Sequence, residues 1–241
     1  MTFQQKKNML LDGKEYFKYG MLPVLALCGI TAIEPSLSAA MAIGVAMMTT
    51  LFLSGVKPKR FWSYVLFLGA GVLVLMLGVS WRRERLFTLF GQGTVDYQIK
   101  QSILAIGSGG FLGKGLGNGT QKFLFLPELQ NDFIFANIGE EGGLVACLIV
   151  IFLYIFIVIR GIRIANQAPD RFGFLYGNSV MVLLGFQALV NIGVATGVLP
   201  VTGMALPFVS AGGSSMLILF AMMGPILNMS RQIKYRKRKK R

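Results

Sequence analysis

Residues 101–145 read QSILAIGSGGFLGKGLGNGTQKFLFLPELQNDFIFANIGEEGGLV, and this stretch indicates how the rest of the chain is built. A polar segment rich in glycine lies between two apolar runs and ends in Asp132, directly before the apolar residues that start at Phe133. Loops longer than about 12–15 residues in a compact protein are usually functional or disordered. An acid where a loop enters a bilayer is costly to place, so Asp132 is the first candidate for a catalytic or binding role.

The composition of the whole chain is that of a membrane protein. Of its 241 residues, 54% are hydrophobic and 14% are charged, and the mean hydropathy is +0.62. The chain has no histidine, which excludes histidine-based triads and metal sites built from cysteine and histidine. The two cysteines, Cys28 and Cys147, lie inside apolar runs, and we interpret them as small buried hydrophobic residues.

The apolar runs predict an all-α polytopic membrane protein that forms a single membrane domain over residues 1–241. A hydrocarbon core of ~30 Å needs roughly 20 apolar residues per helix, and a helix satisfies its own backbone hydrogen bonds in lipid. We expect about six transmembrane helices. One large extracellular loop, residues 80–132, is expected between the third and the fourth helix. A basic cytoplasmic tail, residues 231–241, is expected after the last helix. The expected spans are residues 20–33, 38–56, 61–79, 133–159, 173–197 and 214–229.

The orientation follows from the lysines and arginines, which favour the cytoplasmic side. With the N-terminus and C-terminus both inside, eighteen of the 24 basic residues lie in the cytoplasmic segments and six lie outside. Eight of the eighteen are in the tail, where a basic cluster beside an apolar run binds anionic lipid, so the net charge of +14 does not indicate nucleic acid. We therefore expect a multi-pass membrane protein with both termini in the cytoplasm.

The six outward basic residues all lie in the glycine-rich loop or shortly before it, and they are either solvated loop charges or a cradle for a phosphate-bearing substrate. Glycines allow backbone N–H groups to point at an anion. The candidate ligands are Lys114, Arg82, Arg83, Lys122 and Gln121.

Asp132 is expected in the first turn of a helix, where it either caps the helix or acts as a general base on the outer face. Glu128 is close in sequence and either shares that task or binds a cation. Glu140 and Glu141 lie two turns into the same apolar run, where a carboxylate faces a polar cavity or forms a structural ion pair with an arginine.

A second polar cluster occupies residues 187–215. Gln187 and Asn191 are four residues apart and therefore share one helix face. Prolines and glycines then interrupt the helix, and Ser214 and Ser215 begin the last apolar run. Non-helical backbone at membrane depth lines a cavity or is buried in protein, so these four polar residues are candidate substrate ligands; helix–helix hydrogen bonding is the alternative.

Four segments in this order resemble the SEDS family (shape, elongation, division and sporulation), which includes FtsW, RodA and SpoVE. They read GITAIEPSLSAAM at 29–41, IGSGGFLGKGLGNGTQK at 106–122, FLPE followed by NDFIFANIGEEGG at 125–143, and QALVNIGVATGVLPVTGMALPFVSAGGSS at 187–215. The amino-acid sequence of these segments is closer to the FtsW and SpoVE branch than to RodA. Family members have about ten spans, and the last six match, so we expect an N-terminally truncated homologue, a fragment or a split gene.

The resemblance implies a peptidoglycan glycosyltransferase that polymerises lipid II into glycan strands for division, cell shape or spore wall synthesis. A sugar 4-hydroxyl attacks the anomeric carbon of the growing chain and undecaprenyl diphosphate leaves. The family's essential aspartate aligns with Asp132 as general base, and the outward basic residues would hold the pyrophosphate.

The resemblance also implies a class B penicillin-binding protein as partner, and it leaves the cofactor unknown, with a divalent cation as one option. Two other functions stay open. The chain could be a lipid II flippase, or a truncated scaffold that binds the transpeptidase without catalysis.

Overall fold

Seven α-helices make up most of the described part of the chain, and that part contains no strand. The computed structural model describes residues 22–33, 37–56, 58–78, 97–120 and 132–239. The helices are α3 (Leu22–Ile33), α4 (Leu37–Leu53), α5 (Pro58–Gly78), α7 (Tyr97–Gly109), α9 (Ile134–Ala165), α10 (Arg171–Ala195) and α11 (Gly213–Lys239).

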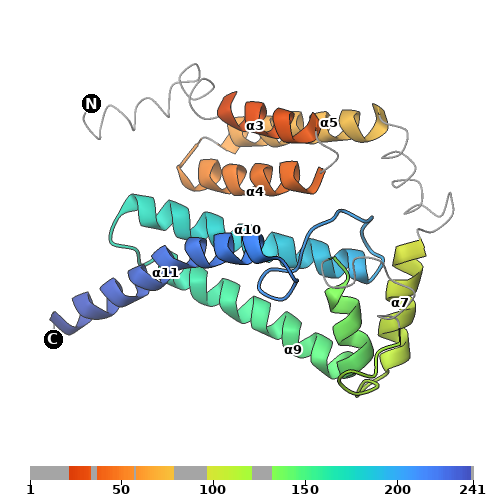
Figure 1. The fold of residues 1–241 in the computed structure, drawn as a ribbon. Coiled ribbons are helices and arrows are strands. Elements are labelled where there is room, and N and C mark those ends of the chain that lie inside the picture. Colours follow the sequence, from red (N-terminus) through yellow and green to blue (C-terminus); the bar gives the residue numbers. More distant parts are fainter. Residues whose placement is uncertain (1–21, 34–36, 57, 79–96, 121–131, 240–241) are drawn as a thin grey trace.

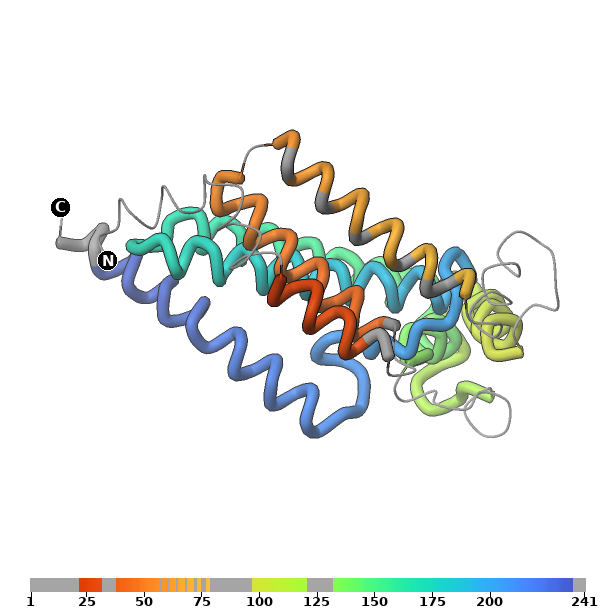
Figure 2. The backbone as a smooth tube through the Cα atoms, turned by 90° about the horizontal axis from the view of Figure 1, so that it is seen from above, coloured from red at the N-terminus to blue at the C-terminus, as the bar shows by residue number. Residues whose placement is uncertain are grey.

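Helix α10 is the centre of the arrangement, because it contacts α4, α7, α9 and α11. In Figure 1, α3, α4 and α5 form one layer above α10, α9 runs below it, and α7 stands across one end. Figure 2, at right angles, shows α5 and α11 on opposite flanks of the molecule. The main hydrophobic core joins α9, α10 and α11 around Met181, Leu184 and Ile226, so the last three helices pack as one unit.

Local sequence explains several helix ends and contacts. Proline occupies the first position of α5, where its missing N–H costs nothing. The N-cap residue of α10 is Asp170, whose carboxylate accepts a hydrogen bond from Gly173 N at 3.0 Å. Polar side chains then join α4 to α10: the hydroxyls of Thr50 and Ser179 are 2.7 Å apart.

Each of the six expected spans overlaps a helix, but the helix bounds differ from the expected ones. Helices α9 and α10, with 32 and 25 residues, are long and apolar enough to cross a membrane. The same holds for the 23 residues of α11 from Gly213 to Tyr235. The apolar parts of α3, α4 and α5 are shorter, at 10–17 residues, so their crossing stays a prediction. The expected loop 80–132 contains a helix, α7, and the basic tail continues α11 to Lys239.

Helix α9 is broken at Gly143, a feature that the sequence analysis did not predict. Gly143 has φ 67° and ψ −167°, a conformation that favours glycine. The break separates a short half (residues 134–142) from a long half (residues 144–165), and Figure 1 shows the short half turning away beside α7. Helix α9 therefore begins at Ile134, but its long apolar half begins only after Gly143.

The glycine loop, residues 110–120, fills the break and satisfies its backbone groups. Leu144 N donates to Gly110 O at 2.9 Å and Val145 N to Phe111 O at 3.3 Å. On the other side, Lys114 N donates to Glu140 O and Gly115 N to Glu141 O, both at 3.0 Å. These four bonds replace helical ones, which explains how backbone can leave the helix near membrane depth.

Candidate functional site

Asp132 lies directly before the short half of α9 and is half-buried. The N-cap position belongs to Phe133, which makes no side-chain cap hydrogen bond and is only 1% exposed. Phe133 packs in a second hydrophobic cluster with Ala105 of α7, Val190 of α10 and Met204. A buried ring next to Asp132 therefore holds this end of α9 against two other helices.

Asn191 of α10 connects Asp132 to the segment that follows α10. Its Nδ2 donates to Asp132 O at 2.8 Å and to Met204 O at 2.7 Å, and the residue is 1% exposed. Because both N–H groups are used by carbonyls, the orientation of the amide is fixed and Oδ1 is left buried without a hydrogen-bond partner. This geometry suits a residue that positions Asp132, whereas the sequence analysis expected Asn191 to bind substrate.

The Asp132 carboxylate approaches exposed backbone at Gly203. A Cβ built on Gly203 would lie 3.8 Å from Asp132 Oδ2, and Gly203 has φ 70°. A side chain at this position would be strained and would cover part of the carboxylate. With glycine at residue 203, no side chain of that residue contacts the carboxylate.

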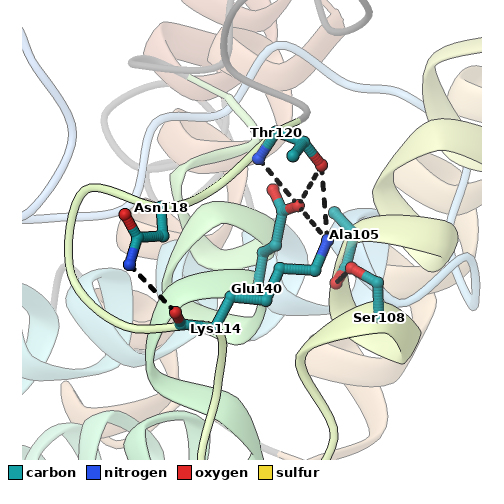
Figure 3. Close-up of polar contacts among 6 residues, drawn as sticks. All are labelled: Ala105, Ser108, Lys114, Asn118, Thr120 and Glu140. Carbon is teal, nitrogen blue, oxygen red and sulfur yellow. Dashed lines mark hydrogen bonds and ion pairs between the residues drawn. The ribbon is translucent and has the colours of Figure 1, made fainter.

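The glycine loop does surround anions, but these are carboxylates of the protein itself (Figure 3). Glu140 Oε1 accepts from Lys114 Nζ at 2.7 Å, from Thr120 N at 2.9 Å and from Thr120 Oγ1 at 2.8 Å. Glu141 Oε2 accepts from Gly117 N at 3.0 Å. The structural ion pair that was one alternative for Glu140 is therefore present, with a lysine in place of the expected arginine.

Burial makes this ion pair consequential. The Glu140 side chain is 0% exposed and that of Lys114 is 32% exposed. A buried carboxylate is stable as an anion only if it is paired and hydrogen-bonded. The buried Glu140 carboxylate therefore needs the Lys114 ammonium beside it. The ammonium predicted to hold a pyrophosphate already has an anionic partner.

Gln187 and Ser215 line a cavity of about 240 Å³ between α10, α11 and residues 205–210. Ser215 Oγ also donates to Gly212 O at 2.9 Å, and Ser214 beside it is exposed. Asp132 and Asn191 are not among the residues that line this cavity. The structure therefore divides the predicted polar cluster: Asn191 belongs with Asp132, and Gln187 and Ser215 belong to a separate, mostly apolar hollow.

Five predicted site residues lie outside the described residues. They are Arg82, Arg83, Gln121, Lys122 and Glu128, and their roles stay predictions. Within residues that the structure does describe, no group of three or more acidic, cysteine or histidine residues could hold a metal ion.

Sequence reasoning missed two contacts that shape the site. Thr120 supplies two of the hydrogen bonds to Glu140, and Tyr154 of α9 donates its hydroxyl hydrogen bond to Pro207 O. The second contact joins α9 to the segment before α11, which also contains Gly203 and Met204. A signal for the helix break was present, since Gly142 and Gly143 follow two acids in an apolar run.

The fold and the site define a helical membrane protein whose candidate site is at one end of the bundle. The model of the FtsW, RodA and SpoVE family, described as "Cell cycle protein", matches residues 1–235. The chain belongs to this family.

Named relatives agree with this assignment. The chain is 36% identical over 236 residues to "Probable peptidoglycan glycosyltransferase FtsW" of Geobacter metallireducens, covering 93% of this chain and 63% of the relative. It is 36% identical to "Stage V sporulation protein E" of Bacillus subtilis, covering 91% and 62%. The chain thus spans about three fifths of the length of these relatives.

Two solved structures are similar. A chain from a study of "structural coordination of polymerization and crosslinking by a peptidoglycan synthase complex" matches with a TM-score of 0.71 and 26% identity, over 90% of this chain and 62% of the other. The rod shape determining protein RodA of Thermus thermophilus, solved as an aspartate-to-alanine variant, matches with a TM-score of 0.64 and 24% identity, over 95% and 61%. The second likeness supports the fold alone.

Proposed function

We propose that this chain carries the catalytic half of a peptidoglycan glycosyltransferase that polymerises lipid II, with Asp132 as the general base. The names of the relatives support the activity. The observation that carries the proposal is the placement of Asp132: its main chain is tied down by Asn191, and its carboxylate lies beside the bare backbone of Gly203. A general base needs both a fixed position and access to the hydroxyl that it deprotonates.

In the proposed reaction, Asp132 accepts the proton of the acceptor 4-hydroxyl as its oxygen attacks the anomeric carbon of the donor sugar. The bond from that carbon to the pyrophosphate oxygen breaks, and undecaprenyl diphosphate leaves with the bonding electrons. The leaving pyrophosphate needs positive charge. Since Lys114 is already paired with Glu140, this role falls to Arg82, Arg83 and Lys122 in the proposal.

The proposal includes a crosslinking partner, a class B penicillin-binding protein. It is supported by the similarity to a chain from a complex whose description joins polymerization with crosslinking. We propose that the outward side of the cell membrane is the site of the reaction, because the distribution of basic residues favours that side for loop 80–132.

The test is lipid II polymerisation by the purified chain with its partner, comparing the wild type with Asp132→Asn. We expect glycan strands from the wild type and a loss of roughly 100-fold or more in the variant, because a positioned base contributes about that much. Asp170→Asn is the matched control, since Asp170 caps the start of α10 and is not part of the candidate site.

Polymerisation by Asp132→Asn at the wild-type rate would overturn the proposed role of Asp132. If neither protein makes strands but both bind lipid II and the partner, the scaffold function is supported instead.

A further inference from the structure

The glycine loop exposes three large apolar side chains within six residues. Phe111 is 76% exposed, Leu112 is 83% exposed and Leu116 is 90% exposed. A single exposed apolar residue needs no explanation, but a cluster of large ones marks a surface that contacts lipid or protein. The position of the loop along α9 identifies which environment it meets.

The loop is fixed at the end of the apolar part of α9. Between Glu141 and Arg160 the chain has 18 residues and no charge. At a rise of 1.5 Å per residue they span about 27 Å, close to the ~30 Å thickness of the hydrocarbon core. The core boundary therefore falls near Glu141 at one end and near Arg160 at the other.

The hydrogen bonds set the loop at that boundary. Phe111 O accepts from Val145 N, which places Phe111 beside the first residues of the uncharged run, while Gly115 N donates to Glu141 O at its edge. Leu144 and Val145 are themselves 46% and 45% exposed, as residues that face lipid are. The exposed apolar surface of α9 thus continues onto the loop.

Several polar groups of the loop are paired within the protein. Lys114 points to Glu140 and Thr120 (Figure 3), and the N–H groups of residues 113–115 donate to carbonyls of α7 and α9. Backbone can enter the edge of a bilayer only where its hydrogen bonds are made within the protein, and the N–H groups of residues 113–115 meet that condition.

We propose that the glycine loop is a membrane wedge that inserts Phe111, Leu112 and Leu116 into the leaflet on the Glu141 side of the bilayer. Aromatic and aliphatic side chains are stable at this depth, because insertion removes their apolar surface from water. If the proposed function is correct, the wedge also holds the short half of α9, with Asp132 next to it, close to a lipid-linked substrate.

Spin labels on the full chain in phosphatidylethanolamine and phosphatidylglycerol nanodiscs test the wedge. Labels are attached one at a time at Leu112→Cys and Leu116→Cys, in a background with Cys28→Ala and Cys147→Ala. Two reference sites calibrate depth: Phe152→Cys on the outer face of α9, which is 65% exposed in mid-span, and Asn118→Cys, a polar exposed position of the same loop. Collision rates with oxygen report lipid, and those with a water-soluble nickel chelate report water.

We expect the ratio of oxygen to nickel collisions at Leu112 to approach that at Phe152, with Leu116 shallower and Asn118 the most aqueous. Nickel collisions at Leu112 and Leu116 as frequent as at Asn118 would overturn the wedge. Protection from both reagents would overturn it as well and would indicate a protein partner. Neither readout depends on polymerisation, so the wedge and the proposed function can fail separately.

Discussion

The main-chain carbonyl of Asp132 accepts a hydrogen bond from the amide of Asn191, a residue in another helix. Asn191 uses both of its N–H groups on main-chain carbonyls, one of Asp132 and one of Met204. Asn178, thirteen residues earlier on the same helix, is a natural comparison. It is also buried, and its Nδ2 also donates twice, to Asn166 Oδ1 and Phe174 O, but at the other end of α10.

We predict that Asn191→Leu lowers the turnover of lipid II at least tenfold with little change in KM, whereas Asn178→Leu does not. Both variants lose buried hydrogen bonds and should lose about 1–3 kcal/mol of stability. Only Asn191→Leu releases the main chain at Asp132, the proposed base, and small misplacement of a reacting group is costly. Steady-state kinetics at matched temperature measures the difference.

Hydrogen exchange of the peptide that covers residues 132–137 gives a second readout without activity. It should be faster in Asn191→Leu than in the wild type or in Asn178→Leu. Equal exchange and equal turnover in the two leucine variants would show that Asn191 has no positioning role.

The Lys114–Glu140 pair is asymmetric, because Glu140 is fully buried and Lys114 is partly exposed. We predict that Lys114→Met destabilises the protein by about 3 kcal/mol, since it leaves a buried carboxylate without its cation. Glu140→Gln should cost less, because the freed ammonium can reach water. The double variant should recover part of the loss, with a coupling of about 1–3 kcal/mol between the two sites.

Reversible unfolding in detergent micelles measures these differences. Lys100→Met on α7 is the control, since this lysine is exposed, and it should change stability by less than about 0.5 kcal/mol. Strictly additive losses in the double variant would contradict the ion pair as a stabilising unit.

At the scale of elements, the broken helix α9 and the glycine loop form one unit. A Cβ on Gly143 would overlap Gly113 N and Phe111 O, and the φ of 67° is itself unfavourable for any other residue. Helix break and loop therefore depend on each other, and neither can change without the other.

We predict that Gly143→Ala destabilises the protein by at least 2 kcal/mol, a rough value for a strained backbone combined with a steric overlap. Gly107→Ala is the matched control, because Gly107 lies within α7 with open space around its Cα. That change should be neutral or stabilising by about 0.5–1 kcal/mol. A Gly143→Ala protein as stable as the control would mean that α9 can run straight past the loop.

At the scale of the whole molecule, the helices fall into two sets. Helices α3, α4 and α5 form one set, and α7, α9, α10 and α11 form the other. Helix α10 contacts α9, α11 and α7 on one side and α4 on the other, and two polar contacts, Thr50 with Ser179 and Arg171 with Ser54 O, support the second interface. The candidate site lies at the end where α7, α9 and α10 meet through Ala105, Phe133 and Val190. An end of a bundle outside the hydrocarbon core is where residues can face both water and a lipid headgroup.

The sequence by itself determined the class of protein and the approximate limits of six helices, and it singled out Asp132 as a candidate whose role stays a prediction. These depend on the length and hydropathy of apolar runs and on charges at their ends, which are local properties. The four separated motifs were also sufficient for the family, which the match over residues 1–235 confirms.

Only the tertiary structure decided what fills the glycine loop, how Asp132 is held and where α9 breaks. Lys114 and Glu140 are 26 residues apart in sequence, and Asn191 and Asp132 are 59 apart. Sequence shows that such residues are polar, but the choice between a ligand and an internal partner depends on which groups the packing of α7, α9 and α10 brings within hydrogen-bond distance. Desolvation then favours pairing among the buried members, because an unpaired buried charge is costly.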